Sequence, residues 1–325
     1  MDKTVKVACV GTGWVAGRHL TAMTTLQGVE LVGVAGRTEE RAAPLARRFN
    51  TRAFGDYRAM LDATKPDALI ICTIPAAHGD VERAAIERGV PFLVEKPLAT
   101  DWKTAEAIAA EVTAAKLMTS VGYHFRYAAS VQRARELLAG QTISLVEGWW
   151  LSTTPPPAWW SKEELSGGQM IEQTTHIFDL ARYLLGEARS VYGMAGRVKR
   201  ASHPESTVAE VSSAAVTFES GAIGTFNSSC ILPQDNHRVG LHLYADGLAL
   251  ELTVKGLVVD RGGQRLEYRE RDDAIATEGA AFLQAVRTGD RSGIRSTYAD
   301  ALLTHRLTTA ATDSARSGMP EQLRR

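Results

Sequence analysis

This sequence of 325 residues has little cysteine, and it lacks long apolar runs and an excess of charge of either sign. Its 3 cysteines, Cys9, Cys72 and Cys230, are far apart and form no CxxC pair. That pattern argues against a zinc site and is usual in cytosolic proteins. No apolar run approaches the ~18–20 residues of a membrane span, and the first residues enter a strand pattern without the apolar core of a signal peptide. We therefore expect a cytoplasmic protein.

The charges balance, with 37 Lys+Arg against 37 Asp+Glu and a formal net charge of zero. Nucleic acids and anionic membranes attract proteins with a strongly basic field, and no run of five Lys or Arg appears. We expect neither kind of partner. The chain is longer than one typical core requires, so two domains are expected.

The segment up to residue 122 alternates short apolar runs with helical patterns. Continuous apolar runs predict buried strands at residues 5–11, 29–36, 67–75, 90–97 and 117–123, with helices at 38–49, 79–89 and 101–116 among those between them. Thr38 is a candidate N-cap. Strands that alternate with helices predict right-handed βαβ units. The fold class is therefore α/β, with an N-terminal Rossmann domain built on a doubly wound parallel sheet at residues 1–122.

The remainder, residues 123–325, has a different pattern. One helix (130–140) and a strand (143–151) lead through a Pro/Trp loop into a helix that runs to Gly186, and then strands follow without helices between them. Turn signals such as FESG and YADG separate these strands, and two helices close the chain. We expect a C-terminal α+β domain with a large, mainly antiparallel open sheet, which binds substrate and forms oligomers.

A glycine-rich turn follows the first predicted strand and opens a helix. In GTGWVAG, Gly11 permits the tight turn, Gly13 lets the backbone approach a pyrophosphate, and Ala16 allows close packing of helix and strand. The helix N-terminus presents N–H groups to the phosphates. The alternative is a turn that serves packing only. The cofactor-binding residues predicted here are Gly11, Thr12, Gly13, Trp14 and Val15.

The end of the second strand bears on which nicotinamide cofactor binds. NAD-binding proteins usually place an acid there for the ribose 2′-hydroxyl, and this chain has Gly36, Arg37 and Thr38 instead. Arg37 can pair with a 2′-phosphate, so the sequence favours NADP(H) over NAD(H). The alternative is that Arg37 is only a solvated arginine and that Glu39 or Glu40 reaches the ribose.

Glu95, Lys96 and Pro97 end a strand at the carboxyl edge of the predicted sheet, where ligands bind in open α/β sheets. Lys96 can hydrogen-bond a substrate oxygen and exchange a proton with it, with Glu95 orienting it. An exposed lysine in a turn is an equally good interpretation of the spacing.

The stretch GGQMIEQTTHIFDL, residues 167–180, sets Glu172, His176 and Asp179 at helical spacing. At 100° per residue they fall within about 60° of one another, between apolar stripes. A plain i,i+4 Glu–His pair is one alternative, and a metal pair is another, although no further ligand has a recognisable spacing. We expect no metal.

These motifs resemble those of the Gfo/Idh/MocA oxidoreductases, the glucose–fructose oxidoreductase and inositol dehydrogenase group. GTGWVAGRH, TIPAAH (73–78), VEKPLA (94–99) and the stretch at 167–180 occur in that family's order and spacing, so the resemblance covers essentially the whole chain. It implies a nicotinamide-dependent oxidoreductase of sugars, polyols or related alcohols, with open sheet faces that form dimers or tetramers.

The resemblance also implies roles for individual residues. Lys96 matches the lysine that contacts the reacting hydroxyl, His176 the usual proton donor or acceptor, and Pro97 a proline often preceded by a cis bond. Two departures stand out, because the family usually has Asp at Glu172 and Gly at Thr174. The other implied positions are Thr73, Ile74, Pro75, His78, Glu95 and Lys96 toward the cofactor, and Lys96, Tyr123, Arg126, Glu172 and His176 toward the substrate.

Four of the 6 tryptophans lie at 149, 150, 159 and 160. Aromatic faces stack on sugar C–H surfaces, and Trp159 and Trp160, in the loop, are the better candidates for a substrate wall. Core or interface packing is at least as good an interpretation for Trp149 and Trp150.

The sequence thus predicts reversible hydride transfer at a carbon of a sugar-like substrate, with Lys96, His176 and Glu172 as catalytic residues. One alternative is a redox-neutral enzyme that oxidises a glycoside, eliminates or hydrolyses it, and reduces the product. A second is a non-catalytic protein that senses the cofactor. The expected partners are a small sugar or polyol and further copies of the chain, as a homodimer or homotetramer.

Overall fold

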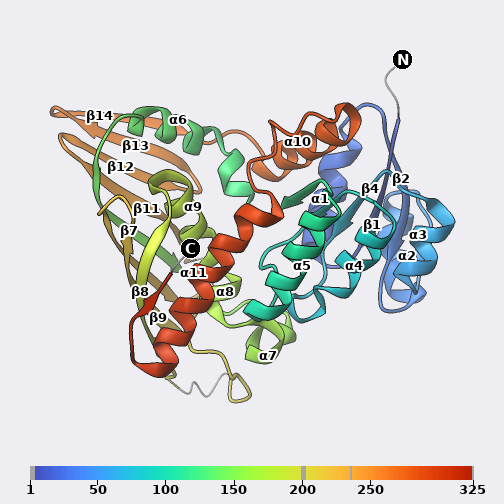
Figure 1. Cartoon of the computed structure of the whole chain (residues 1–325), viewed down its shortest axis with the longest axis horizontal. Coiled ribbons are helices and arrows are strands. Elements are labelled where there is room, and N and C mark those ends of the chain that lie inside the picture. Colours follow the sequence, from blue (N-terminus) through green and yellow to red (C-terminus); the bar gives the residue numbers. More distant parts are fainter. Residues whose placement is uncertain (1–3, 199–202, 235, 324–325) are drawn as a thin grey trace. The chain divides into compact units, whose positions relative to one another are not determined.

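The computed structural model describes residues 4–198, 203–234 and 236–323, which form two compact units. The first unit comprises Met1–Ala99, Lys103–Tyr127 and Asp273–Leu302, and the second comprises Thr100–Trp102, Ala128–Asp272 and Leu303–Arg325 (Figure 1). The two-domain division at residues 122 and 123 stays a prediction. The two units differ from it in that residues 123–127 and Asp273–Leu302 cluster with the first unit, and Thr100–Trp102 clusters with the second.

The first unit contains a six-stranded parallel sheet in the order β3-β2-β1-β4-β5-β6. This is the doubly wound sheet that the alternating pattern predicts. Its strands are β1 (Val5–Val10), β2 (Val29–Ala35), β3 (Ala53–Phe54), β4 (Ala68–Ile71), β5 (Phe92–Val94) and β6 (Thr119–Val121).

Helices cover both faces of this sheet, and each face has its own apolar core. On one face, α1 (Trp14–Thr24), α2 (Glu39–Arg48) and α10 (Ala274–Thr288) pack around Val7, Cys9 and Ile70. On the other face, α3 (Tyr57–Thr64), α4 (Asp80–Glu87) and α5 (Trp102–Ala114) pack around Val10, Leu69 and Phe92. The connection after β4 includes the short 3₁₀ helix η1 (Pro75–Ala77), and η2 (His124–Tyr127) follows β6.

The second unit contains a nine-stranded sheet in the order β14-β13-β12-β11-β7-β10-β9-β8-β15. Every neighbouring pair is antiparallel except β7 and β10, as the sequence predicts for a mainly antiparallel sheet. Its strands are β7 (Ile143–Leu151), β8 (Ala188–Gly196), β9 (Val211–Phe218), β10 (Ile223–Ser229), β11 (Arg238–Ala245), β12 (Leu248–Thr253), β13 (Gly256–Arg261), β14 (Gln264–Arg269) and β15 (Glu321–Gln322).

Helices lie on one face of the nine-stranded sheet. Phe178 of α9 (Thr175–Leu185) packs on Phe226 of β10, and α6 (Ala129–Leu138) contacts β12 and β13. The backbone of α11 (Tyr298–Ser317) approaches β8 so closely that a Cβ at Gly193 would lie 2.1 Å from the carbonyl oxygen of Ala311. The other face carries four exposed large apolar side chains, those of Leu145, Tyr192, Met194 and Ile223.

The prediction of one unbroken helix that runs to Gly186 is wrong. The segment forms two helices, α8 (Gln169–Glu172) and α9, and the preceding Pro/Trp loop contains η3 (Ala158–Ser161) and α7 (Glu163–Ser166). Between α8 and α9 the hydrogen-bond ladder shifts. The Thr174 N–H donates to the carbonyl of Gln169, five residues back, and the N–H groups of His176 and Ile177 donate only three residues back. Such a widened turn is a local π-type irregularity, a feature often found at functional sites.

Candidate functional site

The glycine-rich turn in the first unit is built to receive a phosphate group. Gly11 has φ +123°, and a Cβ there would lie 2.3 Å from the carbonyl oxygen of Cys72, so only glycine fits. Gly13 is the N-cap of α1 and, within the described residues, no side chain caps it or lies within 4 Å of the place where its Cβ would be. The first N–H groups of α1 are therefore open to an anion beside Thr12, Trp14 and Val15.

Arg37 and Thr38 follow β2 at the same carboxyl edge of the sheet, and Arg37 is exposed. The Thr38 hydroxyl accepts the N–H of Arg41 at 3.4 Å and caps α2, which confirms the predicted N-cap. Glu40 is held locally, because hydrogen bonds from its own backbone and from Thr38 lower the pKa of its carboxyl. Arg37 is thus an exposed cation at this edge, and the carboxylate of Glu40 is already engaged in local hydrogen bonds.

Buried polar side chains support the loop after β4, which contains Thr73, Ile74, Pro75 and His78. His78 is buried, with Nε2 3.3 Å from the Thr73 carbonyl oxygen and Nδ1 3.3 Å from Glu82 Oε1. Burial raises the pKa of Glu82, whose other oxygen accepts the Gly79 N–H at 2.6 Å. The buried Oγ1 of Thr73 has no hydrogen-bond partner among the described residues, so it fits a loop that awaits a polar ligand.

Lys96 is half-buried at the carboxyl end of β5, two residues beyond the last strand residue, Val94. Its peptide bond to Pro97 is cis, as the resemblance implied. Because β1, β4 and β5 are parallel, the glycine-rich turn, the loop after β4 and Lys96 all lie at one edge of the same sheet. That edge is where open α/β sheets bind ligands.

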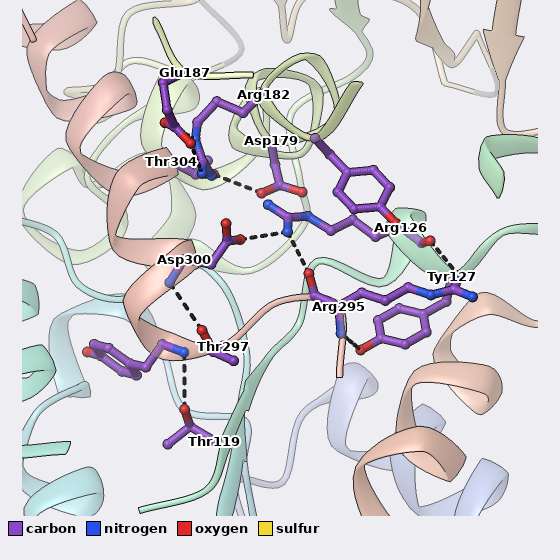
Figure 2. Close-up of polar contacts among 12 residues, drawn as sticks. Thr119, Arg126, Tyr127, Asp179, Arg182, Glu187, Arg295, Thr297, Asp300 and Thr304 are labelled. Atoms are coloured by element: carbon purple, nitrogen blue, oxygen red, sulfur yellow. Dashed lines mark hydrogen bonds and ion pairs between the residues drawn. The ribbon is translucent and has the colours of Figure 1, made fainter. Parts of the chain in front are cut away.

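Tyr123 and Arg126 are both buried side chains of the first unit. Tyr123 is fully buried, and Arg126 is 2% exposed. The Arg126 guanidinium lies 2.6 Å from Asp300 Oδ2 and donates to the carbonyl oxygen of Arg295 at 2.6 Å (Figure 2). Within the first unit these contacts engage Arg126 in structure, so its predicted substrate role stays a prediction.

Glu172 lies at the end of α8, and the shift in the hydrogen-bond ladder separates it from His176 in α9. Its Oε2 accepts the Nε1–H of Trp160 at 2.6 Å, and both side chains are buried. Trp160 in turn packs on Val208 and Cys230, with Trp159 partly buried beside it. Trp160 is therefore a buried partner of Glu172, and Trp159 is the more accessible of the two loop tryptophans.

His176 lies in the first turn of α9, and the strand tryptophan Trp150 holds its ring. The two rings stack with centroids 5.5 Å apart and planes 14° apart. Trp150 also contacts His237 edge-on, and the Nδ1 of His237 is 2.8 Å from Ser152 Oγ. Sequence reasoning ranked Trp150 below the loop tryptophans and did not identify His237. The alternation of side chains along β7 was the available signal. Val146 and Trp150 share the helix-covered face, whereas Trp149 lies on the opposite face, against His242.

Asp179 anchors α9. It is buried, and its Oδ1 accepts the Thr304 hydroxyl at 2.8 Å, while the same Thr304 oxygen accepts Arg182 Nη1–H at 2.7 Å (Figure 2). The Arg182 guanidinium also forms a bidentate pair with Glu187, with both distances 2.8 Å. Asp179 therefore fixes the helix that carries His176.

Within the described residues, no helix is both long and apolar enough to span a bilayer. Across the same residues, no three His, Cys, Asp or Glu side chains gather closely enough to hold a metal ion.

Two family models match most of the chain. The oxidoreductase family with an NAD-binding Rossmann fold matches residues 5–123, and the GFO/IDH/MocA C-terminal domain matches residues 131–249. Among relatives, scyllo-inositol 2-dehydrogenase (NAD(+)) of Bacillus subtilis is 29% identical over 99% of this chain and 97% of its own length. D-Glucoside 3-dehydrogenase of Escherichia coli is 28% identical over 56% of this chain and 54% of its own length.

Solved structures share the fold over nearly the full length. Levoglucosan dehydrogenase in complex with NADH has a TM-score of 0.88 and 20% identity, covering 99% of both chains. GenD2 from gentamicin A biosynthesis, in complex with NAD, has a TM-score of 0.86 and 22% identity, covering 100% of this chain and 98% of that one. With its Rossmann unit, its glycine-rich turn and both family models in sequence order, the chain belongs to the Gfo/Idh/MocA family of nicotinamide-dependent oxidoreductases.

Proposed function

We propose that this protein catalyses reversible hydride transfer between a nicotinamide cofactor and a carbon that bears a hydroxyl or carbonyl on a sugar, polyol or sugar derivative. In the oxidative direction a secondary alcohol and the oxidised cofactor give a ketone, the reduced cofactor and one proton. The observation that carries the proposal is the position of Lys96, which ends a strand at the same sheet edge as the uncapped start of α1. The names of the inositol and glucoside dehydrogenase relatives support the substrate class.

The chain's own residues divide the remaining work. His176 takes the hydroxyl proton on oxidation and returns it on reduction, and stacking on Trp150 holds the plane of its ring. Lys96 donates a hydrogen bond to the same substrate oxygen. Glu172 positions substrate and tunes His176, with one oxygen held by Trp160. The bound nicotinamide supplies the site that accepts or gives the hydride.

The test is a screen of sugars and polyols for a change in nicotinamide absorbance, followed by variants on the best substrate. Lys96→Ala and His176→Ala should each lower kcat by about 100-fold or more, because each removes a group that acts on the reacting oxygen. Both should bind cofactor as the wild type does. Lys103→Ala, an exposed lysine at the start of α5, is the control. If both active-site variants retain near wild-type kcat, the assignment fails, and turnover of a glycoside without net change in cofactor would favour the redox-neutral alternative.

For the cofactor we propose a preference for NADP(H). The support is an exposed Arg37, no acid at residues 36–38, and a Glu40 carboxylate held at the start of α2. The name of the scyllo-inositol relative specifies NAD(+), so the preference is a statement about this chain alone. Calorimetry should give a lower Kd for NADP⁺ than for NAD⁺. Arg37→Gln should raise the NADP⁺ Kd by about 10-fold or more and leave NAD⁺ within about 2-fold. Tighter NAD⁺ binding by the wild type would reject the proposal.

We further propose that the chain works in the cytoplasm as a homodimer or homotetramer. The four exposed apolar side chains on the open face of the nine-stranded sheet support self-association. Multi-angle light scattering should report two or four chains, and Met194→Asp combined with Ile223→Asp should shift the mass toward one chain. A monomeric wild type at micromolar concentration would contradict this proposal.

A further inference from the structure

His19 is a fully buried histidine in α1, the helix that begins at the glycine-rich turn. It lies on the same face as Ala16, Leu20 and Met23, which are core residues. A polar ring in such surroundings costs free energy unless it is hydrogen-bonded. Its single hydrogen bond among the described residues joins Nε2 to Glu95 Oε1, at 2.8 Å.

The geometry fixes the direction of that bond. The Nδ1 of His19 is buried and has no partner among the described residues, so a proton there would be a buried N–H without an acceptor. The ring therefore carries its proton on Nε2 and donates to Glu95. The pair as a whole holds one negative charge, on the carboxylate.

Glu95 is confined on its other sides as well. Its Oε2 accepts the N–H of Lys96 at 3.2 Å, and its own N–H donates to the Ile71 carbonyl at 2.8 Å. A Cβ at Gly122 would lie 2.9 Å from both carboxylate oxygens, so the backbone after β6 packs directly on the group. The carboxylate has no room to turn away from Lys96.

The groups that surround Glu95 keep it ionised. Burial opposes its charge, but the hydrogen bond from His19, helped by the nearby Lys96, outweighs burial and lowers the pKa of its carboxyl. Burial also lowers the pKa of His124 to about 4, so at neutral pH that imidazole is uncharged. Cys72, after β4, also faces this charge, and its pKa is raised well above the usual value, chiefly by its hydrogen bond with Cys9 and by burial. Glu278, a fully buried carboxyl group of α10, also acts on the Cys72 thiol.

We propose that His19 and Glu95 form a buried positioning pair that holds a fixed negative charge behind Lys96 and keeps that lysine an ammonium, placed to donate a hydrogen bond. The proposal rests on the proposed function, which it deepens. It assigns Lys96 the role of a cationic donor that polarises the substrate oxygen and leaves the exchange of the proton to His176. The proposal also gives α1 two roles. Its first N–H groups lie at the glycine-rich turn, and its His19 holds the carboxylate of Glu95 next to Lys96.

The first test needs no substrate. The wild type, Glu95→Gln and His19→Leu are treated with an amine-acylating reagent between pH 7 and 9, and the acylation rate at Lys96 is followed by mass spectrometry. Only the uncharged amine reacts. Removing the carboxylate, or the donor that holds it, should make Lys96 react about tenfold faster at pH 8, the change expected if its titration moves by about one pH unit. Lys103 in the same samples should react at an unchanged rate.

A second measurement separates positioning from loss of folding. His305→Gln is the matched control, because His305 is also a fully buried histidine in a helix, with Nε2 3.1 Å from the carbonyl oxygen of Asp101. It should lower Tm as His19→Leu does and leave the labelling of Lys96 unchanged. Where a substrate is in hand, Glu95→Gln and His19→Leu should lower kcat by about 10-fold or more, keep the cofactor Kd within about 3-fold, and lower the pH at which activity falls on the alkaline side.

The outcomes separate the two proposals. Equal Lys96 labelling in wild type, Glu95→Gln and His19→Leu would overturn the positioning pair, whatever the protein oxidises. Faster labelling with no turnover of any sugar or polyol would keep the pair and reject the proposed function.

Discussion

At the scale of single residues, Glu172 has the clearest change of interpretation. The sequence marks it as a longer acid at a position where the family usually has Asp, and the structure shows where the extra length goes. Its carboxylate reaches back 12 residues to the indole N–H of Trp160. A shorter side chain at this position would leave a buried N–H unpaired, so the acid and the tryptophan make sense only together.

A double-mutant cycle tests that pairing. Trp160→Phe removes the N–H, Glu172→Gln removes the charge, and the double variant removes both. Hydrogen bonds to charged groups contribute about 1.5–3 kcal/mol, so the unfolding free energies should show a coupling of about that size. Urea unfolding followed by circular dichroism measures all four proteins, and additive effects within about 0.5 kcal/mol would show that the two side chains act independently.

Residue types could be predicted from the sequence where spacing along the chain carries the information. Gly11, Thr38 and Lys96 all depend on local order, and the structure places each where the pattern indicated, whereas the cis bond before Pro97 was implied by the family resemblance alone. The pairs Trp150–His176 and His19–Glu95 join residues 26 and 76 positions apart, and only the packing of helix on sheet brings them together. No periodicity along one element contains that information.

At the scale of elements, the two short helices α8 and α9 show what periodicity misses. The apolar positions from Met170 to Leu185 fit one helix, yet the ladder slips at Gln173 and Thr174. Strand β14 shows a different failure, because Leu266 and Tyr268 alternate with charged residues and yet all six residues of the strand are exposed. In both places tertiary contacts decide the structure, and propensity does not.

The position of α9 depends on the network around Thr304, which donates to Asp179 and accepts from Arg182. Thr304→Val keeps the shape of the side chain and removes both bonds. It leaves a buried carboxylate short of a donor, so the unfolding free energy should fall by about 2 kcal/mol. Because α9 carries His176, kcat should fall more than KM rises.

Thr309→Val is the matched control for that variant. Thr309 lies on the same helix, α11, and its buried hydroxyl has no hydrogen-bond partner among the described residues. Removing an unsatisfied hydroxyl should leave stability unchanged or raise it slightly. Urea unfolding of both variants decides the matter, and equal losses would mean that the network does not hold α9.

At the scale of the whole molecule, sequence order and spatial order diverge near the C-terminus. The fold classes of both domains follow from the pattern of strands and helices. The return of residues 273–302 to the first unit does not, because Phe282 and Leu283 of α10 look like any other apolar helix positions. They join the core that contains Val7 and Leu20, at a separation of more than two hundred residues that no local signal spans.

The stability of the molecule should fall on mild acidification, and His124 provides a specific reason. Burial lowers the pKa of His124 from 6.5 to about 4. Its contribution to stability is therefore complete above pH 6.5 and is lost as the pH falls toward 4, because the unfolded chain binds a proton that the folded chain does not. The full shift corresponds to about 3 kcal/mol.

The Tm of the wild type should consequently decrease between pH 6.5 and 4.5, before most carboxylates titrate. His124→Gln lacks the titrating group, so its Tm should change less over that interval even if it starts lower at pH 7.5. His203→Gln, in a loop of the second unit, is the control and should retain the slope of the wild type. Scanning calorimetry at four pH values gives the three slopes, and a slope for His124→Gln equal to that of the wild type would show that another group governs the acid sensitivity. A flatter slope for that variant alone would assign the acid sensitivity of the protein to His124, in η2 of the first unit.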